Sequence, residues 1–137
     1  MNLQWAQYWI GLFKDRTDEL MSLYSETFEF EDVNLGIHIK NDLPALRAFF
    51  SAFVNEDENA SFNRFEVFEY VGDNRLGCFQ WTWETKHSSD FLGLPAAGKT
   101  TKTRGVTVMG WDENGKIILE RSISDFIPVF KQLGLMT

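Results

Sequence analysis

Long runs of alternating apolar and polar residues, joined by tight turns, constrain the fold of this chain most strongly. Alternation of period two places successive side chains on opposite faces of a sheet, so each run predicts a strand. The turn at Asn114-Gly115 supplies the positive φ angles that two-residue hairpins favour. The second half of the chain therefore predicts an antiparallel meander whose strands cover residues 62–71, 75–88, 100–112 and 116–124.

The first half of the chain alternates between helical and strand periodicity. Residues 3–13 carry an apolar stripe at helical spacing, and a second helix is predicted after Asp15 or Thr17. Two short alternating runs, 28–33 and 37–40, precede a third helix that extends to about residue 54. The order is α-α-β-β-α-β-β-β-β with a small final helix, which predicts an α+β fold with helices packed against one curved sheet.

The length and composition limit the classes of function. A chain of 137 residues forms one domain, and its 44% hydrophobic and 15% aromatic content predicts an apolar interior built largely of rings. A net charge of −7 without a basic cluster argues against a nucleic-acid partner. The single Cys78 excludes an internal disulfide and a multi-cysteine zinc site, and two distant histidines give no metal-binding pattern.

The N-terminus shows no basic segment followed by an apolar run. Gln4, Gln7 and Lys14 interrupt the only apolar stretch there, so neither a signal peptide nor a membrane span is indicated. We therefore expect a cytoplasmic protein without a membrane partner.

The predicted strand at 75–88 has two very different faces. One face carries Phe79, Trp81, Trp83, Thr85 and His87, and the other carries Cys78, Gln80, Thr82, Glu84 and Lys86. A row of large rings that ends in a titratable group is typical of a hydrophobic ligand site with one polar end. The alternative is that the rings only pack against the helices and that His87 lies exposed at the strand end.

The stretch from Lys116 to Leu135 changes from strand to helical periodicity at Asp125. Asp at that point is a common N-cap of a helix, with Pro128 in its first turn and Gly134 at its end. If the preceding strand runs straight, Ile117, Leu119, Arg121, Ile123 and Asp125 share one face, and Asp125 closes a mostly apolar wall. Spacing alone leaves the cap and a catalytic carboxylate both open.

Several motifs resemble the SnoaL-like branch of the NTF2-like superfamily. Residues 91–99 (FLGLPAAGK) resemble the family's G-x-P-P-T-G loop, and residues 112–117 (DENGKI) resemble its D-G-K-I hairpin. Asp125 precedes a helix that ends in Gln132-Leu133-Gly134, as in the family. The motifs cover residues 87–135, and the order of elements extends the likeness to nearly the whole chain.

The resemblance implies a fold and a set of site residues. The fold is a single NTF2-like cone over residues 1–137, a curved, mostly antiparallel sheet with three packing helices and a short C-terminal helix. The implied catalytic residues are Asp125 as base and His87 as proton donor. Substrate-binding residues would be Phe79, Trp81, Trp83, Trp111 and Arg121. The family's ring-closing aldol chemistry requires neither a metal nor a cofactor.

The chain departs from the family at three places. Residues 85–93 (TKHSSDFLG) keep the His, the Phe and the last Gly of the family's G-T-H-x-G-x-F-x-G stretch but lack its two earlier glycines. Ala96 and Ala97 replace the second Pro and the Thr of the loop, and Arg121 replaces an aromatic residue four positions before the aspartate. Arg121 can bind a carboxylate on a ligand or turn outward to solvent, because a long Arg side chain can reach either environment.

Two classes of function are therefore open. The first is a cofactor-free acid/base enzyme that acts on a small hydrophobic carbonyl substrate, by aldol cyclisation or by ketosteroid isomerase-like proton transfer. The second is a non-catalytic protein that binds a small hydrophobic ligand. An epoxide hydrolase-like site would need a second carboxylate beside Arg121, and none can be named from the sequence. The resemblance also implies a homodimer that pairs through the outer face of the sheet, where Val106 and Val108 offer apolar surface.

Overall fold

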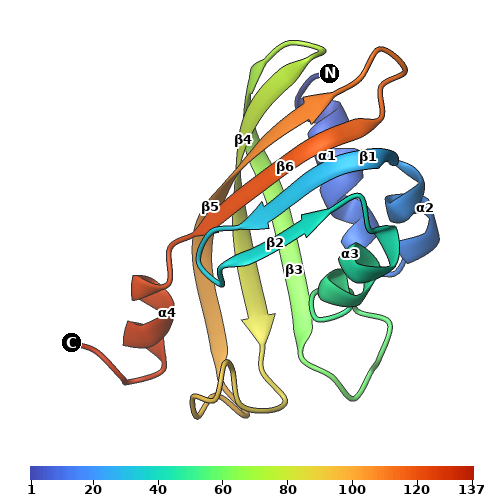
Figure 1. Cartoon of the computed structure of the whole chain (residues 1–137). Helices are drawn as coiled ribbons and strands as arrows, with labels where there is room; N and C mark the ends of the chain where they lie inside the picture. Colours follow the sequence, from blue (N-terminus) through green and yellow to red (C-terminus); the bar gives the residue numbers. More distant parts are fainter.

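The computed structural model describes all residues, 1–137, and contains one six-stranded sheet covered by helices (Figure 1). The spatial order of the strands is β2-β1-β6-β5-β4-β3. In chain order the strands are β1 (Tyr24–Asp32), β2 (Ile37–Lys40), β3 (Phe62–Gly72), β4 (Leu76–Lys86), β5 (Thr100–Trp111) and β6 (Ile117–Ser124). The α+β class and the four-stranded meander agree with the prediction.

One pair of strands in the sheet is parallel. Strands β3 to β6 pair antiparallel in sequence order, and β1 pairs antiparallel with β2. Strand β1 lies parallel to β6, so that Phe30 is opposite Glu120 and Asp32 is opposite Ser122. This pairing joins the first and last strands of the chain and brings their side chains onto one wall.

The helices begin where the sequence supplies caps. Asn2 accepts a hydrogen bond from the Trp5 amide at the start of α1, and Asp42 accepts one from the Ala45 amide at the start of α3. The helices are α1 (Leu3–Gly11), α2 (Thr17–Ser22), α3 (Leu43–Phe50) and α4 (Ile127–Gln132), with a 3-10 turn η1 (Leu12–Lys14) after α1. None of these helices has the length and apolar character needed to cross a membrane.

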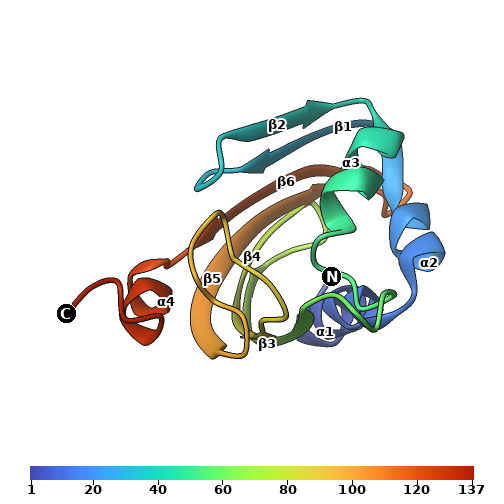
Figure 2. The same ribbon diagram turned by 90° about the horizontal axis from the view of Figure 1, so that it is seen from below.

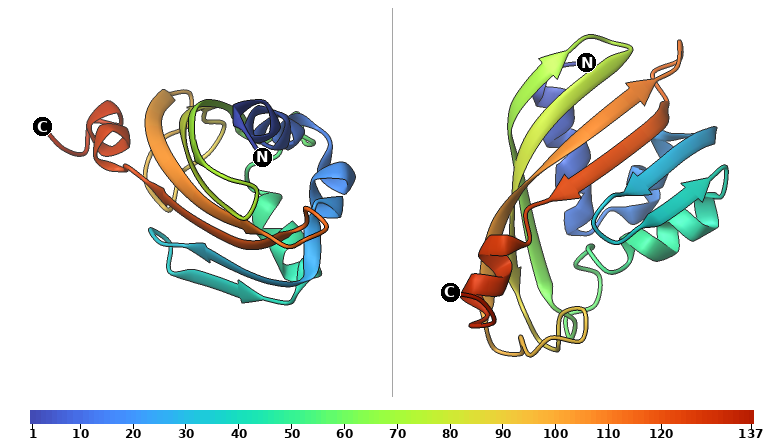
Figure 3. Two further views of the ribbon diagram at one scale, coloured as in Figure 1. Left: turned by 90° about the horizontal axis from the view of Figure 1, so that it is seen from above. Right: turned by 60° about the vertical axis from the view of Figure 1, so that its left-hand side comes forward.

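The sheet curls around the first three helices. Seen from below, β3 to β6 form an arc, and α1, α2 and α3 close its open side (Figure 2). Helix α4 lies outside this arc beyond the end of β6, and both views of Figure 3 show it apart from the other helices. Val129 of α4 and Leu133, directly after the helix, pack on Ala96 of the loop before β5, so this segment holds that loop at the end of the sheet.

Aromatic rings fill most of the interior between the helices and the sheet. Trp9 of α1 makes edge contacts with Phe13 and with Phe79 of β4, at centroid distances of 5.5 and 5.3 Å. Edge-to-face pairs of this kind add about 0.5–1.5 kcal/mol each beyond the burial of their area. The inner face of β4 alternates as predicted, because Phe79, Trp81, Trp83, Thr85 and His87 are all buried.

Strand β6 does not run straight, and the predicted face of Asp125 is wrong for that reason. Gly110 of β5 is opposite Leu119, but Trp111 is opposite Ile117, so Ile118 is an extra residue. Such a bulge shifts the alternation by one position. Ile117 and Glu120 are buried on the inner side, whereas Arg121 and Asp125 are exposed on the outer side.

Candidate functional site

A cavity of about 420 Å³ lies between the concave face of the sheet and helices α1 and α3. This volume is within the range of about 300–1,000 Å³ that holds small organic ligands. Most of its lining is hydrophobic, and aromatic rings are the largest group, with Trp81 and Trp83 from β4, Trp9 from α1 and phenylalanines from α3 and β3. Polar side chains of the lining belong to two groups, one on β1 and β6 and one near the end of β4.

Glu120 is the most unusual polar residue of the wall. Its exposed fraction is 3%, although it lies in the middle of β6 and carries a carboxyl group. Burial raises the pKa of Glu120 to about 8, with a further increase from the nearby Asp32 carboxyl and an opposing effect of the Tyr24 hydrogen bond. At neutral pH the Glu120 carboxyl is therefore mostly protonated.

Asp32 lies diagonally across from Glu120 on the neighbouring strand. Asp32 is opposite Ser122, which is the next inward-facing residue of β6 after Glu120. Asp32 therefore lies one inward-facing position beyond Glu120 on the same wall. Burial raises the pKa of Asp32, while backbone amides that donate to its carboxylate act in the opposite direction. The Leu35 amide donates to Asp32 Oδ1 at 3.0 Å, which fixes the carboxylate in the turn between β1 and β2.

Hydroxyl groups complete this end of the cavity. Trp81 Nε1 donates to Thr107 Oγ1 at 2.9 Å, and Thr107 Oγ1 lies 2.8 Å from Ser122 Oγ. The two hydroxyls have two hydrogens and share one between them. One hydroxyl hydrogen of the pair is therefore left without an acceptor between the two side chains.

His87 marks the second polar group, near the end of β4. Its exposed fraction is 6%, so the alternative of an exposed strand-end histidine does not hold. His87 Nε2 pairs with Thr101 Oγ1 at 2.8 Å, and burial lowers the pKa of the ring. A neutral imidazole at this point can exchange hydrogen bonds or accept a proton, but it is not a cationic acid at neutral pH.

Asn63 holds the rings beside His87. Its side-chain Oδ1 accepts from Trp83 Nε1 and from Thr85 Oγ1, both at 2.9 Å, and its Nδ2 donates to the Ala52 carbonyl. The side-chain oxygen of Asn63 therefore orients Trp83 and Thr85, and one Nδ2 hydrogen has no partner within the protein.

The structure separates the predicted site residues into two sets. Trp81, Trp83 and His87 line the cavity. Phe79 and Trp111 are completely buried in the aromatic core and contact Trp9 and Trp5 instead of the cavity.

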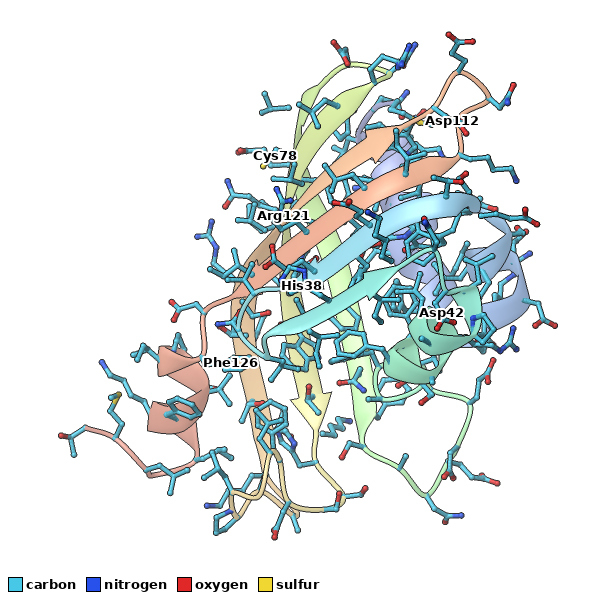
Figure 4. The ribbon with its side chains drawn as sticks, viewed as in Figure 1. His38, Asp42, Cys78, Asp112, Arg121 and Phe126 are labelled. Carbon is cyan, nitrogen blue, oxygen red and sulfur yellow. The ribbon has the colours of Figure 1, made fainter.

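Arg121 and Asp125 are on the opposite face of the sheet. Arg121 Nε lies 2.9 Å from Glu31 Oε1, and His38 contacts the same carboxylate (Figure 4). The Ile127 amide donates to Asp125 Oδ1 at 3.1 Å, so the exposed carboxylate stabilises the start of α4. Ser124 and Phe126 line the cavity on either side of Asp125, whereas Asp125 itself does not.

Sequence reasoning missed Glu120 and Asp32. The assumption of a straight β6 assigned Glu120 to the face opposite Asp125, and Asp32 was not singled out within the alternating run 28–33. The sequence held one signal for each residue. Asp32 alternates with Phe28 and Phe30, which places it on their face. The three consecutive apolar residues Ile117-Ile118-Leu119 do not fix which of them points inward, so the face of Glu120 was open.

A profile of the SnoaL-like polyketide cyclase family matches residues 12–133. This chain belongs to that family. No curated protein matches the SnoaL-like chain in sequence.

Solved structures with the same fold share little sequence with this SnoaL-like protein. A SnoaL-like protein from Shewanella putrefaciens CN-32 has a TM-score of 0.78 at 14% identity, covering 97% of this chain and 96% of that one. An LEH-like epoxide hydrolase from M. tuberculosis has a TM-score of 0.70 at 12% identity, covering 96% and 87%. A protein with a ketosteroid isomerase-like fold from Catenulispora acidiphila, in complex with trimethylamine, has a TM-score of 0.74 at 10% identity, covering 98% and 95%. The family and its cone-shaped fold agree with the prediction.

Proposed function

We propose that this SnoaL-like protein is an acid/base enzyme that acts, without a cofactor in the chemical step, on a small hydrophobic carbonyl compound. The observation that carries the proposal is the buried Glu120 carboxyl in the wall of an aromatic cavity, with the Asp32 carboxyl diagonally across from it. Burial raises the pKa of Glu120 to about 8. Two carboxyl groups whose surroundings give them different pKa values are a common arrangement for an acid and a base.

The proposed reaction begins with proton abstraction next to the carbonyl. Asp32 accepts the proton from the carbon, and Glu120 donates a hydrogen bond or its proton to the carbonyl oxygen, which gains negative charge. The resulting enol attacks a second carbonyl of the same molecule in an aldol cyclisation, or takes a proton at another carbon in an isomerisation. In either route Asp32 then gives up the proton that it took, to the new hydroxyl group in the cyclisation or to the other carbon in the isomerisation. Glu120 keeps or regains its own proton, so both carboxyl groups return to their starting states.

The other residues of the cavity position the substrate and exclude water from it. The rings of Trp81 and Trp83 hold a hydrophobic substrate in a folded shape, which favours an intramolecular reaction. Neutral His87 offers a hydrogen bond to a second oxygen of the substrate at the other polar group. In this proposal His87 positions the substrate by a hydrogen bond, and the role of proton donor that the resemblance implied for it passes to Glu120.

Non-catalytic binding of a small hydrophobic ligand is the second candidate function. The observation that favours it is the outward carboxylate of Asp125, because the cavity lacks the aspartate that the family resemblance implied as base. An epoxide hydrolase-like reaction is less well supported, since Arg121 pairs with Glu31 on the outer face.

Hydrogen–deuterium exchange distinguishes the two functions without knowledge of the natural substrate. Small aryl ketones are incubated with the protein in D₂O, and loss of the α-proton NMR signal is followed over time. The enzyme proposal predicts exchange above the buffer rate, reduced by about 10²-fold or more in Glu120→Gln. Glu31→Gln, on the outer face of β1, is the matched control. Binding of the ketone without faster exchange would leave the ligand-binding function.

We also propose that two copies pair through the outer face of the sheet. Val106 and Val108 are partly exposed there, and Ile123 is 49% exposed beside them. Light scattering should give about twice the 15.9 kDa monomer mass. A monomer mass at every concentration would contradict this assembly.

A further inference from the structure

The mouth of the cavity lies between two loops. The exposed residues of the lining are Ala52, Ala60, Ser89, Asp90 and Leu92. They belong to the connection from α3 to β3, residues 51–61, and to the loop from β4 to β5, residues 87–99. Figure 1 shows both connections at the same end of the sheet, opposite the hairpins β3–β4 and β5–β6. A ligand therefore enters past these two loops, and Leu92 is the only large apolar residue among the exposed ones.

Hydrogen bonds fix the base of the loop between β4 and β5. The Gly98 amide donates to the His87 carbonyl at 2.9 Å, which closes the loop at the end of β4. The Ser88 amide donates to Ser61 Oγ at 3.0 Å, which joins this loop to the connection between α3 and β3. The two sides of the mouth are therefore held together at the base of the loop.

Phe91 fixes the middle of the same loop. Its ring makes edge contacts with Trp83 and with Phe126, at centroid distances of 6.0 and 5.9 Å, and lies 5.4 Å from the His87 ring. All four rings line the cavity. The next residue, Leu92, therefore follows a fixed neighbour and is held at the mouth.

Leu92 is the first central residue of a tight turn. Phe91 and Leu94 exchange backbone hydrogen bonds of 2.9 and 2.8 Å around Leu92 and Gly93. Leu92 has a φ of 52° and Gly93 a φ of 78°. Positive φ at both central residues is the type I′ turn, for which Asn-Gly is the preferred pair.

The backbone of Leu92 is in an unfavourable conformation. A leucine with positive φ brings its Cβ too close to the neighbouring carbonyl oxygen, and Asn or Gly at this position avoids most of that strain. The side chain gains little in return from the fold, because it is 54% exposed. Strain of this kind at the mouth of a cavity points to a function of the side chain that it holds.

We propose that Leu92 covers the outer end of a bound ligand, and that the turn keeps its strained backbone because this backbone holds Leu92 at the mouth. The ligand then removes the exposed apolar surface of Leu92 from water, which stabilises the complex and slows dissociation. The inference rests on the proposed function only in that the cavity takes a ligand, and it applies equally to an enzyme and to a binding protein.

The test uses acetonaphthone, a small aryl ketone, as the probe. Binding is followed by NMR through the indole N–H signals of Trp81 and Trp83, both of which line the cavity. Leu92→Asn creates the preferred Asn-Gly turn, so the melting temperature should stay equal or rise. The affinity for the ketone should nevertheless fall by about five- to tenfold, because the apolar cover is lost. Leu92→Met keeps an apolar side chain and should bind within about twofold of the wild type.

Leu76→Asn is the matched control. Leu76 is 55% exposed, against 54% for Leu92, but it lies at the start of β4, whereas the loop follows the end of that strand. The control should leave the affinity for the ketone unchanged. Equal affinity of the wild type and Leu92→Asn, an equal loss in Leu76→Asn, or a lower melting temperature of Leu92→Asn would each overturn the inference.

The outcome can be told apart from failure of the proposed function. In an enzyme, Leu92→Asn should raise the ketone concentration that gives half-maximal α-proton exchange and keep the maximal rate within about twofold, since Leu92 lies at the mouth and Glu120 is buried. Weaker binding by Leu92→Asn, with no exchange in either protein, would keep the role of Leu92 and remove the catalysis. Exchange with an unchanged half-maximal concentration would keep the catalysis and remove the role of Leu92. Absence of ketone binding by the wild type would remove both.

Discussion

Tyr24 of β1 donates its hydroxyl hydrogen to the carboxyl group of Glu120 on β6, entirely inside the core. Trp9 Nε1 donates to the Tyr24 oxygen at 3.2 Å, so the phenol accepts from one side and donates to the other. Burial, with the Glu120 charge next, raises the pKa of Tyr24, and the phenol keeps its proton. The Tyr24 hydroxyl therefore fixes which oxygen of Glu120 carries the exchangeable proton.

Removal of the Tyr24 hydroxyl should raise the pKa of Glu120 further. In Tyr24→Phe the carboxylate loses the donor that favours its charged form, and Trp9 Nε1 loses its acceptor. We expect a loss of about 1–3 kcal/mol in the free energy of unfolding, from urea denaturation. Tyr8→Phe, at a partly exposed position on α1, is the control and should change neither quantity. An unchanged Glu120 pKa in Tyr24→Phe would show that the two groups are not coupled.

The stability of the protein should fall as the pH rises above about 4.5. The pKa of Glu120 is raised in the folded state, from 4.5 to about 8, so between these values the unfolded chain releases a proton that the folded chain retains. The free energy of unfolding then falls by up to about 1.4 kcal/mol per pH unit. Burial also raises the pKa of Asp32, so its ionisation lowers the free energy of unfolding with rising pH in the same way. Burial lowers the pKa of His87, so this residue makes the free energy of unfolding increase with pH up to its usual pKa.

Glu120→Gln isolates the contribution of Glu120 to this pH dependence. The amide keeps an acceptor for Tyr24 but cannot ionise, so its melting temperature should depend less on pH between 5 and 8. If the melting temperatures of the wild type and the variant changed equally with pH between 5 and 8, Glu120 would not titrate in that range.

Gly105 of β5 gives Trp81 the space to lie flat on the sheet. A Cβ at this position would lie 2.2–2.6 Å from ring atoms of Trp81, and the ring is held by its hydrogen bond to Thr107. Gly105→Ala should therefore cost about 1–3 kcal/mol and move the Trp81 indole N–H signal. Gly11→Ala is the control, because no atom lies within 4 Å of an added Cβ at the end of α1. A Gly105→Ala protein of wild-type stability would contradict the close approach.

Substitution of Asp125 should change the stability of the protein and have little effect on its activity. Asp125→Ala removes the acceptor for the Ile127 amide at the start of α4, which should cost about 1 kcal/mol. Asp125→Asn keeps an acceptor and should be nearly neutral. Loss of ketone exchange in Asp125→Asn, at unchanged melting temperature, would restore this residue as the base and overturn the assignment to Asp32.

The parts of the site that the sequence predicted lie on regular strands. Alternation on β4 placed Trp81, Trp83 and His87 on the inner face correctly, because the strand stays in register with β5 over its whole length. The order of elements, together with the family motifs, predicted the curved sheet and its covering helices.

The parts that the sequence missed depend on contacts between distant residues. The bulge at Ile118 exists only in relation to β5, and it exchanges the faces of Glu120 and Arg121. The environment of Asp32 depends on the parallel pairing of β1 with β6, which joins residues about 90 positions apart. Period and propensity describe one strand at a time, so neither feature could be derived from them.

A carboxyl titration of Glu120 tests the central claim most directly. The protein is labelled with ¹³C-glutamate, the Glu120 signal is assigned by its absence in Glu120→Gln, and its shift is followed against pH with and without acetonaphthone. We predict a midpoint of about 8 in the free protein and a change of that midpoint when the ketone binds, because Glu120 lines the cavity. A midpoint near the usual 4.5, or one that the bound ketone leaves unchanged, would contradict a cavity-facing acid at Glu120.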